Sequence, residues 1–334
     1  IYTHSFDITE VEKGIEFPQV KNTEAYAHFE PYNDKYKIYK TKEDFELYGS
    51  QVSFNGDLLM RPTGLTGGGV MSLDKANVSA QLFTYNADWF KSENSDLDVF
   101  SDDGQLSIET VNLKSHIDLT LREGTFNSNG YNSYVKFPAN QYVAHIDKLE
   151  WAMDKETFIL GDQILGGVGS EFISVHPDQD SLSFYAKTAF YSLKDYIIHT
   201  AGVEDIVVAD AIIYPDSGLV SVAKKANIET LYRANILAND LTEYHTFTNA
   251  TVDIKSANYY IASADYTYKD AMDNEHQIYF KEIKVDEDTI TIASGNITTD
   301  KIFQINDKFD FKGNVDLIAD QKDLIFDGYF MINH

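Results

Sequence analysis

Hydrophobic and polar residues alternate along almost the whole chain, in short segments separated by Asp, Asn, Gly and Ser. Successive side chains of a β-strand point to opposite faces, so this alternation predicts strands with one buried face. Clear examples are "LSIETVNLK", "HIDLTL", "SLSFYA", "HQIYFKEIKV" and "TITIASGNI". Strands this short and numerous predict an all-β fold of stacked antiparallel strands, either an elongated jelly roll or solenoid or a β-sandwich, with few or no helices.

Two segments also carry apolar residues at helical spacing. The apolar positions within residues 140–158 are Tyr142, Val143, Ile146, Leu149 and Met153. They could mark one face of a helix, and the segment stays open between helix and strand. Residues 227–241 show a similar spacing, but "VSVAKKANIETL" just before them alternates with period two. We therefore predict β structure in this second segment.

The C-terminal stretch "GNVDLIADQKDLIFDGYFMINH" predicts a hairpin with a turn over 320–323. Its first strand has Val315, Leu317 and Ala319 on one face. The second strand is apolar on both faces: Leu324, Phe326, Phe330 and Ile332 share one, and Ile325, Tyr329 and Met331 share the other. Since burial stabilises by about 25 cal/mol per Å² of apolar area, we expect another sheet, another part of a longer chain or a lipid to cover these side chains.

Similar phrases recur along the chain, such as "ANVSAQLFTYNADWF", "AFYSLKDYIIHTAG" and "ATVDIKSANYYIASADY". Internal sequence similarity of this kind is expected when similar strand pairs stack on one another. Chance similarity among β-rich segments is the alternative. The glycine-rich segment 160–172 is a candidate boundary. We predict an N-terminal β-rich part over 1–165 and a C-terminal β-rich part over 166–334, stacked continuously.

Composition narrows the function class. The formal charge of -26 opposes binding to nucleic acid or to an anionic membrane surface. The absence of Cys excludes disulfides, a thiol nucleophile and Cys-ligated metals. No run of 18 apolar residues occurs, so we expect no membrane span. The chain opens with "IYTHSFDITE", without an initiator Met or a signal peptide, and we expect a mature product or a fragment.

The densest acidic run is "SENSDLDVFSDDG", which also contains Glu93. A solvated loop is the favoured interpretation, because the residue order of an EF-hand is absent. The alternative is a calcium site, since calcium binds six to eight oxygens and this run could supply several. Its ligands would be Asp96, Asp98, Asp102 and Asp103.

Other chemical motifs are weak. The segment "HPDQD" holds His176, Asp178 and Asp180, but its proline favours an exposed turn over a metal site. The histidines form no zinc motif, the glycine runs lack the pattern of a phosphate loop, and no serine-nucleophile elbow occurs. The aromatic clusters "NSNGYNSY" and "ANYYIASADYTY" could stack on sugars, although packing within strands is the favoured interpretation. We predict no catalytic residue and no cofactor other than calcium.

Several phrases carry a resemblance to known proteins. "SYVKFPANQYVAHIDKLEWAMDKE" and "VADAIIYPDSGLVSVAKKANIETLYRANILAND" resemble large, poorly characterised envelope proteins of Bacteroidota-type bacteria, over roughly residues 50–334. More loosely, the order of apolar, acidic and glycine residues in "GNVDLIAD" and "LIFDG" is similar to that in the OstA/LptA-like family of lipopolysaccharide-transport proteins. Members of that family stack antiparallel strands into an open jelly roll that holds acyl chains. Residues 1–48 depart from such a stack, and their role stays open.

These resemblances imply an extracytoplasmic location: the periplasm, the outer membrane or the cell surface. They favour a non-enzymatic structural or binding protein whose sheets bind other envelope proteins, further parts of a longer chain, or lipid including lipopolysaccharide. The alternative is an extracellular β protein that binds or processes carbohydrate. It would use Tyr and Trp platforms and calcium-bound acidic loops.

Overall fold

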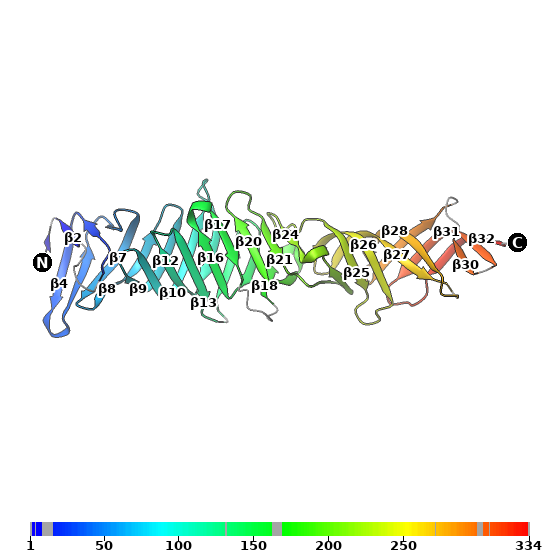
Figure 1. The fold of residues 1–334 in the computed structure, drawn as a ribbon, viewed down its shortest axis with the longest axis horizontal. Helices are drawn as coiled ribbons and strands as arrows, with labels where there is room; N and C mark the ends of the chain where they lie inside the picture. The colour runs from blue at the N-terminus through cyan, green and yellow to red at the C-terminus, as the bar shows by residue number, and fades with distance from the viewer. Residues whose placement is uncertain are drawn as a thin grey trace. The chain divides into compact units, whose positions relative to one another are not determined.

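The computed structural model describes residues 2–3, 5–8, 16–130, 132–161, 169–270, 272–298, 303–306 and 308–332. In these residues the secondary structure is almost entirely β (Figure 1), and the strands form two large antiparallel sheets. The helical turns are short 3₁₀ segments: η1 Pro31–Asn33, η2 Met153–Lys155, η3 Pro177–Gln179 and η4 Asp216–Gly218. The predicted all-β antiparallel fold with few or no helices is confirmed.

The chain divides into two compact units. Unit 1 consists of Ile1–Ala139, Val143–Ile164 and Phe190–Tyr196, and unit 2 of Asn140–Tyr142, Leu165–Ala189 and Ile197–His334. The predicted boundary between 165 and 166 lies outside the described residues.

Unit 1 is a series of antiparallel strands in which most pair with a strand close by in sequence. Its strands are β1 Tyr2–Thr3, β2 Phe6–Ile8, β3 Val20–Asn22, β4 Ala25–Glu30, β5 Lys35–Lys40, β6 Phe45–Leu47, β7 Val52–Arg61, β8 Gly64–Ser72, β9 Ala76–Tyr85, β10 Trp89–Phe100, β11 Leu106–Val111, β12 Leu113–Asp118, β13 Glu123–Ser128, β14 Tyr134–Phe137, β16 Lys148–Ala152 and β17 Thr157–Leu160. The inward positions are filled by aromatic side chains. The Phe83 ring lies 6.5 Å from Phe54 and 5.7 Å from Phe90, edge to face in both pairs.

One corner of unit 1 is built from asparagines. Strand β10 pairs with β12 along its first part and with β11 along its last part. Asn112 separates β11 from β12 with a φ of 60°, a left-handed conformation that Asn tolerates better than most residues. Its side-chain oxygen accepts hydrogen bonds from the amides of Asn94, at 2.7 Å, and Asn129, at 3.4 Å. The chain therefore bends at Asn112, and the segments that contain Asn94 and Asn129 are hydrogen-bonded to the Asn112 side chain.

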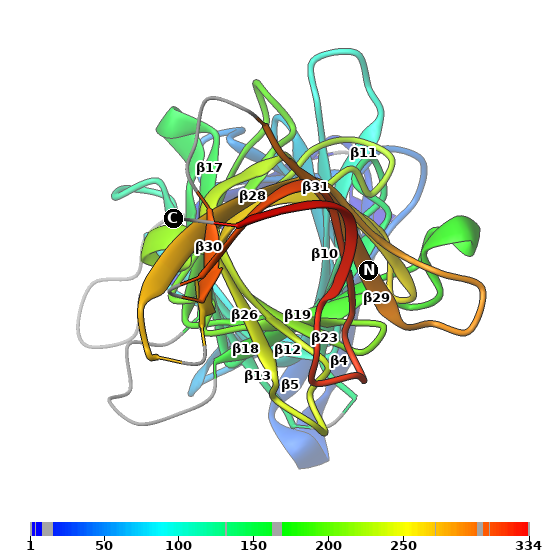
Figure 2. The same ribbon diagram turned by 90° about the vertical axis from the view of Figure 1, so that its right-hand side faces the viewer.

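Unit 2 is also a series of antiparallel strands. Its strands are β18 Ser170–Ser174, β19 Ser183–Ala186, β21 Ile198–Ala201, β22 Ile206–Val208, β23 Ala211–Tyr214, β24 Val220–Val222, β25 Leu231–Ala238, β26 His245–Ser256, β27 Tyr259–Lys269, β28 Glu275–Val285, β29 Thr291–Ile297, β30 Gln304–Asn306, β31 Phe309–Ile318 and β32 Ile325–Ile332. Figure 2 shows how the later strands curl, with β28 and β31 on one side and β23 and β26 on the other. This curvature encloses the apolar faces of β25 to β31, where Phe247 and Phe280 meet edge to face.

The two ambiguous segments are strands. Residues 140–158 contain β15 Tyr142–His145, which has residues in both units, and β16, followed by η2. Buried residues alternate along both strands: Tyr142 and Ala144 in β15, Leu149 and Trp151 in β16. The helical interpretation of this segment is therefore wrong. In 227–241 the predicted β structure is confirmed by β25. (Strand β20, Thr188–Ser192, also has residues in both units.)

Candidate binding edge

The predicted C-terminal hairpin is formed by β31 and β32. Gln321 N–H donates to the carbonyl of Ile318 at 3.0 Å in the turn, and the first strand buries Val315, Leu317 and Ala319 as predicted. Phe330 lies opposite Phe311, and Phe326 opposite Val315. Since residues directly opposite each other share a face, Phe326, Phe330 and Ile332 lie on the core face. Leu324, predicted on the same face, lies just before β32. Ile325, Tyr329 and Met331 lie on the other face, as the alternation predicts.

Large apolar side chains of β32 are exposed on both faces. The exposed fractions are 46% for Ile325, 80% for Tyr329, 54% for Phe330, 40% for Met331 and 64% for Ile332. Together these side chains expose on the order of 500 Å². An apolar patch of this size is comparable with the largest found on typical monomers, and such patches often bind a partner.

Aromatic contacts hold β32 on the sheet at one point. The Phe326 ring lies 5.1 Å from Phe311, 5.5 Å from Tyr268 and 6.1 Å from Phe303. Phe330 contacts Phe311 at 5.3 Å but is still more than half exposed. The strand is therefore anchored through its first aromatic residue, while the side chains after it extend into solvent.

The backbone of β32 also has an unpaired edge. Among the described strands, β32 pairs with β31 alone. An edge strand presents free N–H and C=O groups, and proteins usually protect such edges with charged residues, proline or bulges. The sequence "IFDGYFMI" has one charged residue, Asp327, and no proline. This edge is thus able to pair with a further strand.

The predicted calcium ligands do not converge. Asp96 and Asp98 lie on β10, and Asp102 and Asp103 lie in the turn before β11. Asp96 accepts a hydrogen bond of 2.8 Å from the Asn112 N–H, and Asp103 accepts from the Ser101 hydroxyl and the Gln105 N–H. Across the described ranges, no three acidic or histidine side chains gather as metal ligands would.

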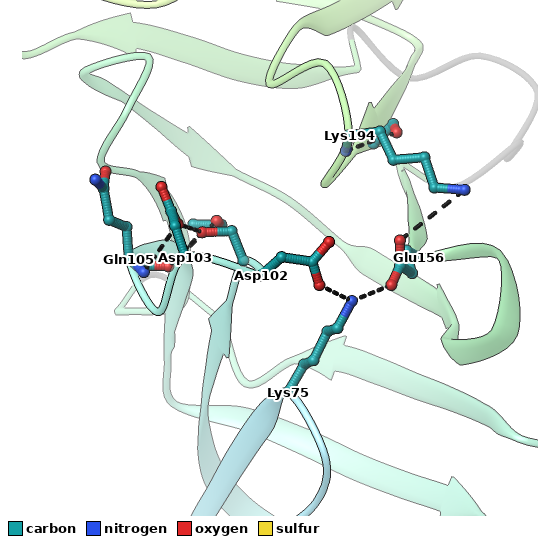
Figure 3. Close-up of polar contacts among 9 residues, drawn as sticks. Lys75, Asp102, Asp103, Gln105, Glu156 and Lys194 are labelled. Atoms are coloured by element: carbon teal, nitrogen blue, oxygen red, sulfur yellow. Dashed lines mark hydrogen bonds and ion pairs between the residues drawn. The ribbon is translucent and has the colours of Figure 1, made fainter.

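Asp102 belongs to an ion-pair cluster, drawn in Figure 3. The Lys75 ammonium lies between Asp102, at 2.5 Å, and Glu156, and Lys194 lies 4.0 Å from Glu156. The hydrogen bonds that the Lys75 ammonium donates to both carboxylates raise the pKa of Lys75 above its ordinary value. A cavity of about 160 Å³ beside the cluster is lined in part by Trp151, Met153 and Leu193. The cluster links four turns of unit 1, and its geometry indicates a structural role.

Asp98 has a different environment from the other acidic residues of this run. Burial raises the pKa of its carboxyl, and the nearby charges of Glu109 and Asp96 raise it further. Glu109 is its direct cross-strand neighbour on β11. Two like charges opposite each other oppose the pairing of the strands.

The segment "HPDQD" and the two aromatic clusters are the remaining candidate motifs of the sequence. His176 accepts a hydrogen bond from the Asp178 N–H at 3.1 Å and caps the N-terminus of η3, so the predicted turn at "HPDQD" is confirmed. In "ANYYIASADYTY", Tyr259 is exposed while Tyr260 is fully buried beside Thr291. Tyr131 of "NSNGYNSY" lies outside the described residues.

Comparison with known proteins gives no assignment, because no model of a known family, no curated protein and no solved structure matches the chain. Within the described residues no helix is long and apolar enough to cross a membrane. The geometry of β32 is therefore the feature that bears most directly on function.

Proposed function

We propose that this chain is a non-enzymatic structural protein of the cell envelope or cell surface, which accepts a β-strand of a partner polypeptide along β32. The observation that carries the proposal is the edge of β32 that no other described strand pairs with, together with exposed apolar side chains on both faces of β32. In such strand addition, main-chain hydrogen bonds supply affinity and alternate side chains supply specificity. The envelope location follows the resemblance of the sequence to Bacteroidota-type envelope proteins.

The chemistry of the edge specifies its partner. Rows of apolar residues on both faces require a partner strand that brings apolar side chains to both faces. The chain has a formal charge of -26, so a partner with basic residues beside this strand associates faster and more tightly than an acidic one.

A lipid is the competing occupant. Acyl chains would cover Tyr329, Phe330 and Ile332, but they cannot hydrogen-bond to the free N–H and C=O groups of the strand. Unsatisfied backbone groups in an apolar environment cost free energy, so an occupant that pairs with them is favoured. A polypeptide strand satisfies both the side chains and the backbone.

The test uses the full chain and a fluorescent nine-residue peptide of five consecutive Val residues flanked on each side by two Lys, so that Val side chains lie on both faces of the added strand. We expect saturable binding that weakens with salt, and slower hydrogen exchange of the amides in 325–332 when the peptide is bound. Phe330→Asp and Tyr329→Asp should weaken binding at least tenfold. Tyr232→Asp is the matched control, because Tyr232 on β25 is 67% exposed but lies away from the edge.

Two outcomes would contradict strand addition. One is peptide binding that the edge substitutions leave unchanged. The other is co-sedimentation of the protein with phosphatidylcholine vesicles, abolished by Phe330→Asp, while the peptide does not bind. This second result would assign the edge to lipid.

A further inference from the structure

A groove of about 630 Å³ lies over β8, β9 and β10 of unit 1. Its volume falls in the range of small-molecule sites. All the residues that line it belong to these three strands, far in sequence from β32.

The groove forms where the strands lose their regular pairing. Between Gly67 and Gly69 the register of β8 on β9 shifts, so that Gln81 and Leu82 are both exposed although they are consecutive. Strand β10 shifts against β12 in the same way, and its consecutive residues Glu93 and Asn94 are both exposed. Two bulges on adjacent strands therefore open the sheet surface between them.

The groove is held in shape by backbone packing and by one hydroxyl. A Cβ atom on Gly68 would lie 2.2 Å from the carbonyl oxygen of Gln81, so the two strands approach as closely as glycine permits. The Ser92 hydroxyl donates to the carbonyl oxygen of Leu82 at 2.8 Å, which ties β10 to β9 across the opening. The site is thus formed before any ligand binds.

The polar groups of the groove are available to a ligand. The side chains of Ser79, Gln81 and Thr84 line it, and none of them hydrogen-bonds to another of the described residues. The Lys91 ammonium stands 5.5 Å from the centre of the Trp89 ring. Glu93 pairs with Lys114 at 2.9 Å, which lowers the pKa of Glu93. The other charged residues of the lining, Lys91 and Asp96, are opposite in sign, so the groove is close to neutral in charge.

We propose that this groove binds a neutral saccharide. A sugar hydroxyl both donates and accepts hydrogen bonds, and free amide and hydroxyl side chains do the same. Leu82, which is 58% exposed, and Val70 provide apolar surface for the C–H face of a sugar ring. The balanced charges of the lining favour neither an anionic nor a cationic ligand, and the charge of -26 opposes a polyphosphate.

The test is calorimetric titration of the full chain with neutral trisaccharides of glucose, mannose and galactose. We expect saturable binding to at least one of them below about 10 mM. Gln81→Ala should weaken it about five- to tenfold, the equivalent of one or two lost hydrogen bonds. Ser79→Trp should abolish it, because Ser79 lies between Val70 and Asp96 in the groove and an indole there fills the space.

The matched control is Gln105→Ala, which removes the same side chain from an exposed turn of unit 1. Circular dichroism confirms that each variant is folded. Phe330→Asp on β32 should leave saccharide binding unchanged, which separates this inference from strand addition. The inference is overturned if no neutral trisaccharide binds, if Gln81→Ala binds like Gln105→Ala, or if a uronic-acid trisaccharide binds more tightly than every neutral one.

Discussion

The hydroxyl of Thr291 donates a hydrogen bond of 2.6 Å to the carboxylate of Asp210, 81 residues earlier in the chain. The Thr291 N–H donates to the same carboxylate at 3.0 Å, and the Tyr260 hydroxyl lies 2.9 Å from the Thr291 hydroxyl. Thr291 and Tyr260 are fully buried. In unit 2 this network ties the turn between β22 and β23 to β27 and β29.

Removal of the central hydroxyl should destabilise unit 2. Thr291→Val keeps the shape of the side chain but leaves the Tyr260 hydroxyl and one carboxylate oxygen with fewer partners. We expect the free energy of unfolding to fall by about 1–3 kcal/mol, measured by urea denaturation. Thr246→Val on β26, where the side chain is exposed, is the control and should change it little. Equal effects of the two variants would contradict a role for the network.

Two glycines of β8 have a positive φ, and one of them, Gly69, also has no room for a side chain. Gly69 has a φ of +152°, and a Cβ there would lie 2.2 Å from the carbonyl oxygen of Asn55. Gly64 on the same strand has a similar φ of +145° but open space around it. Gly69→Ala should cost about 2–4 kcal/mol, and Gly64→Ala about 1 kcal/mol from backbone strain alone. The difference in melting temperature between the two variants measures the cost of the close approach of β8 to β7. Similar melting temperatures would show that these two strands can move apart to admit the methyl group.

The stability of unit 1 should respond to pH through Asp98. A carboxyl whose pKa is raised in the folded state favours folding while it is protonated, and this contribution is lost as pH rises through the folded pKa. Asp98→Asn should therefore stabilise the protein at pH 7, by less than about 1 kcal/mol, and change little at pH 3. Asp57→Asn on β7 removes the same charge from an exposed position. A gain that is equal in both variants would point to net charge instead.

The ion pairs of Lys75 should contribute modestly. Lys75→Met removes the ammonium group that lies between Asp102 and Glu156, so the two carboxylates repel each other without a cation between them. We expect the melting temperature to fall by a few degrees at low salt and by less at high salt, because exposed charges are screened. Lys155→Met, at an exposed position of η2, is the control. A loss that does not depend on salt would assign the effect to the buried stem of Lys75.

Strand alternation made the fold predictable. The period-two pattern places Val315, Leu317 and Ala319 on one buried face, and the structure agrees. Sequence spacing alone does not decide residues 140–158. The structure does, because it buries Tyr142 and Ala144 but not the residue between them. A helix would have buried positions three and four apart. The same pattern could not show that the described residues leave the side chains of β32 exposed, because alternation assigns residues to faces without revealing what lies against each face.

The remaining features depend on contacts that sequence spacing does not encode. Asp96 and Asp103 are near in sequence, but each carboxylate bonds to its own turn or bend. Lys75 and Glu156 are 81 residues apart and meet only because the strands stack. The groove over β8 to β10 arises from two inserted residues that break the period locally. A composition rich in Asp, Ser and Asn does not locate such bulges.

Most strands of unit 2 pair with a strand that is close to them in sequence. In unit 2, β25 to β28 each pair with the strand that follows, and β29 pairs with β31. Contacts of short sequence separation close small loops, so ordering can begin at any of these turns and spread outward. Duplication or deletion of one hairpin would leave the contacts of distant strands intact, which makes such an architecture readily variable in length during evolution.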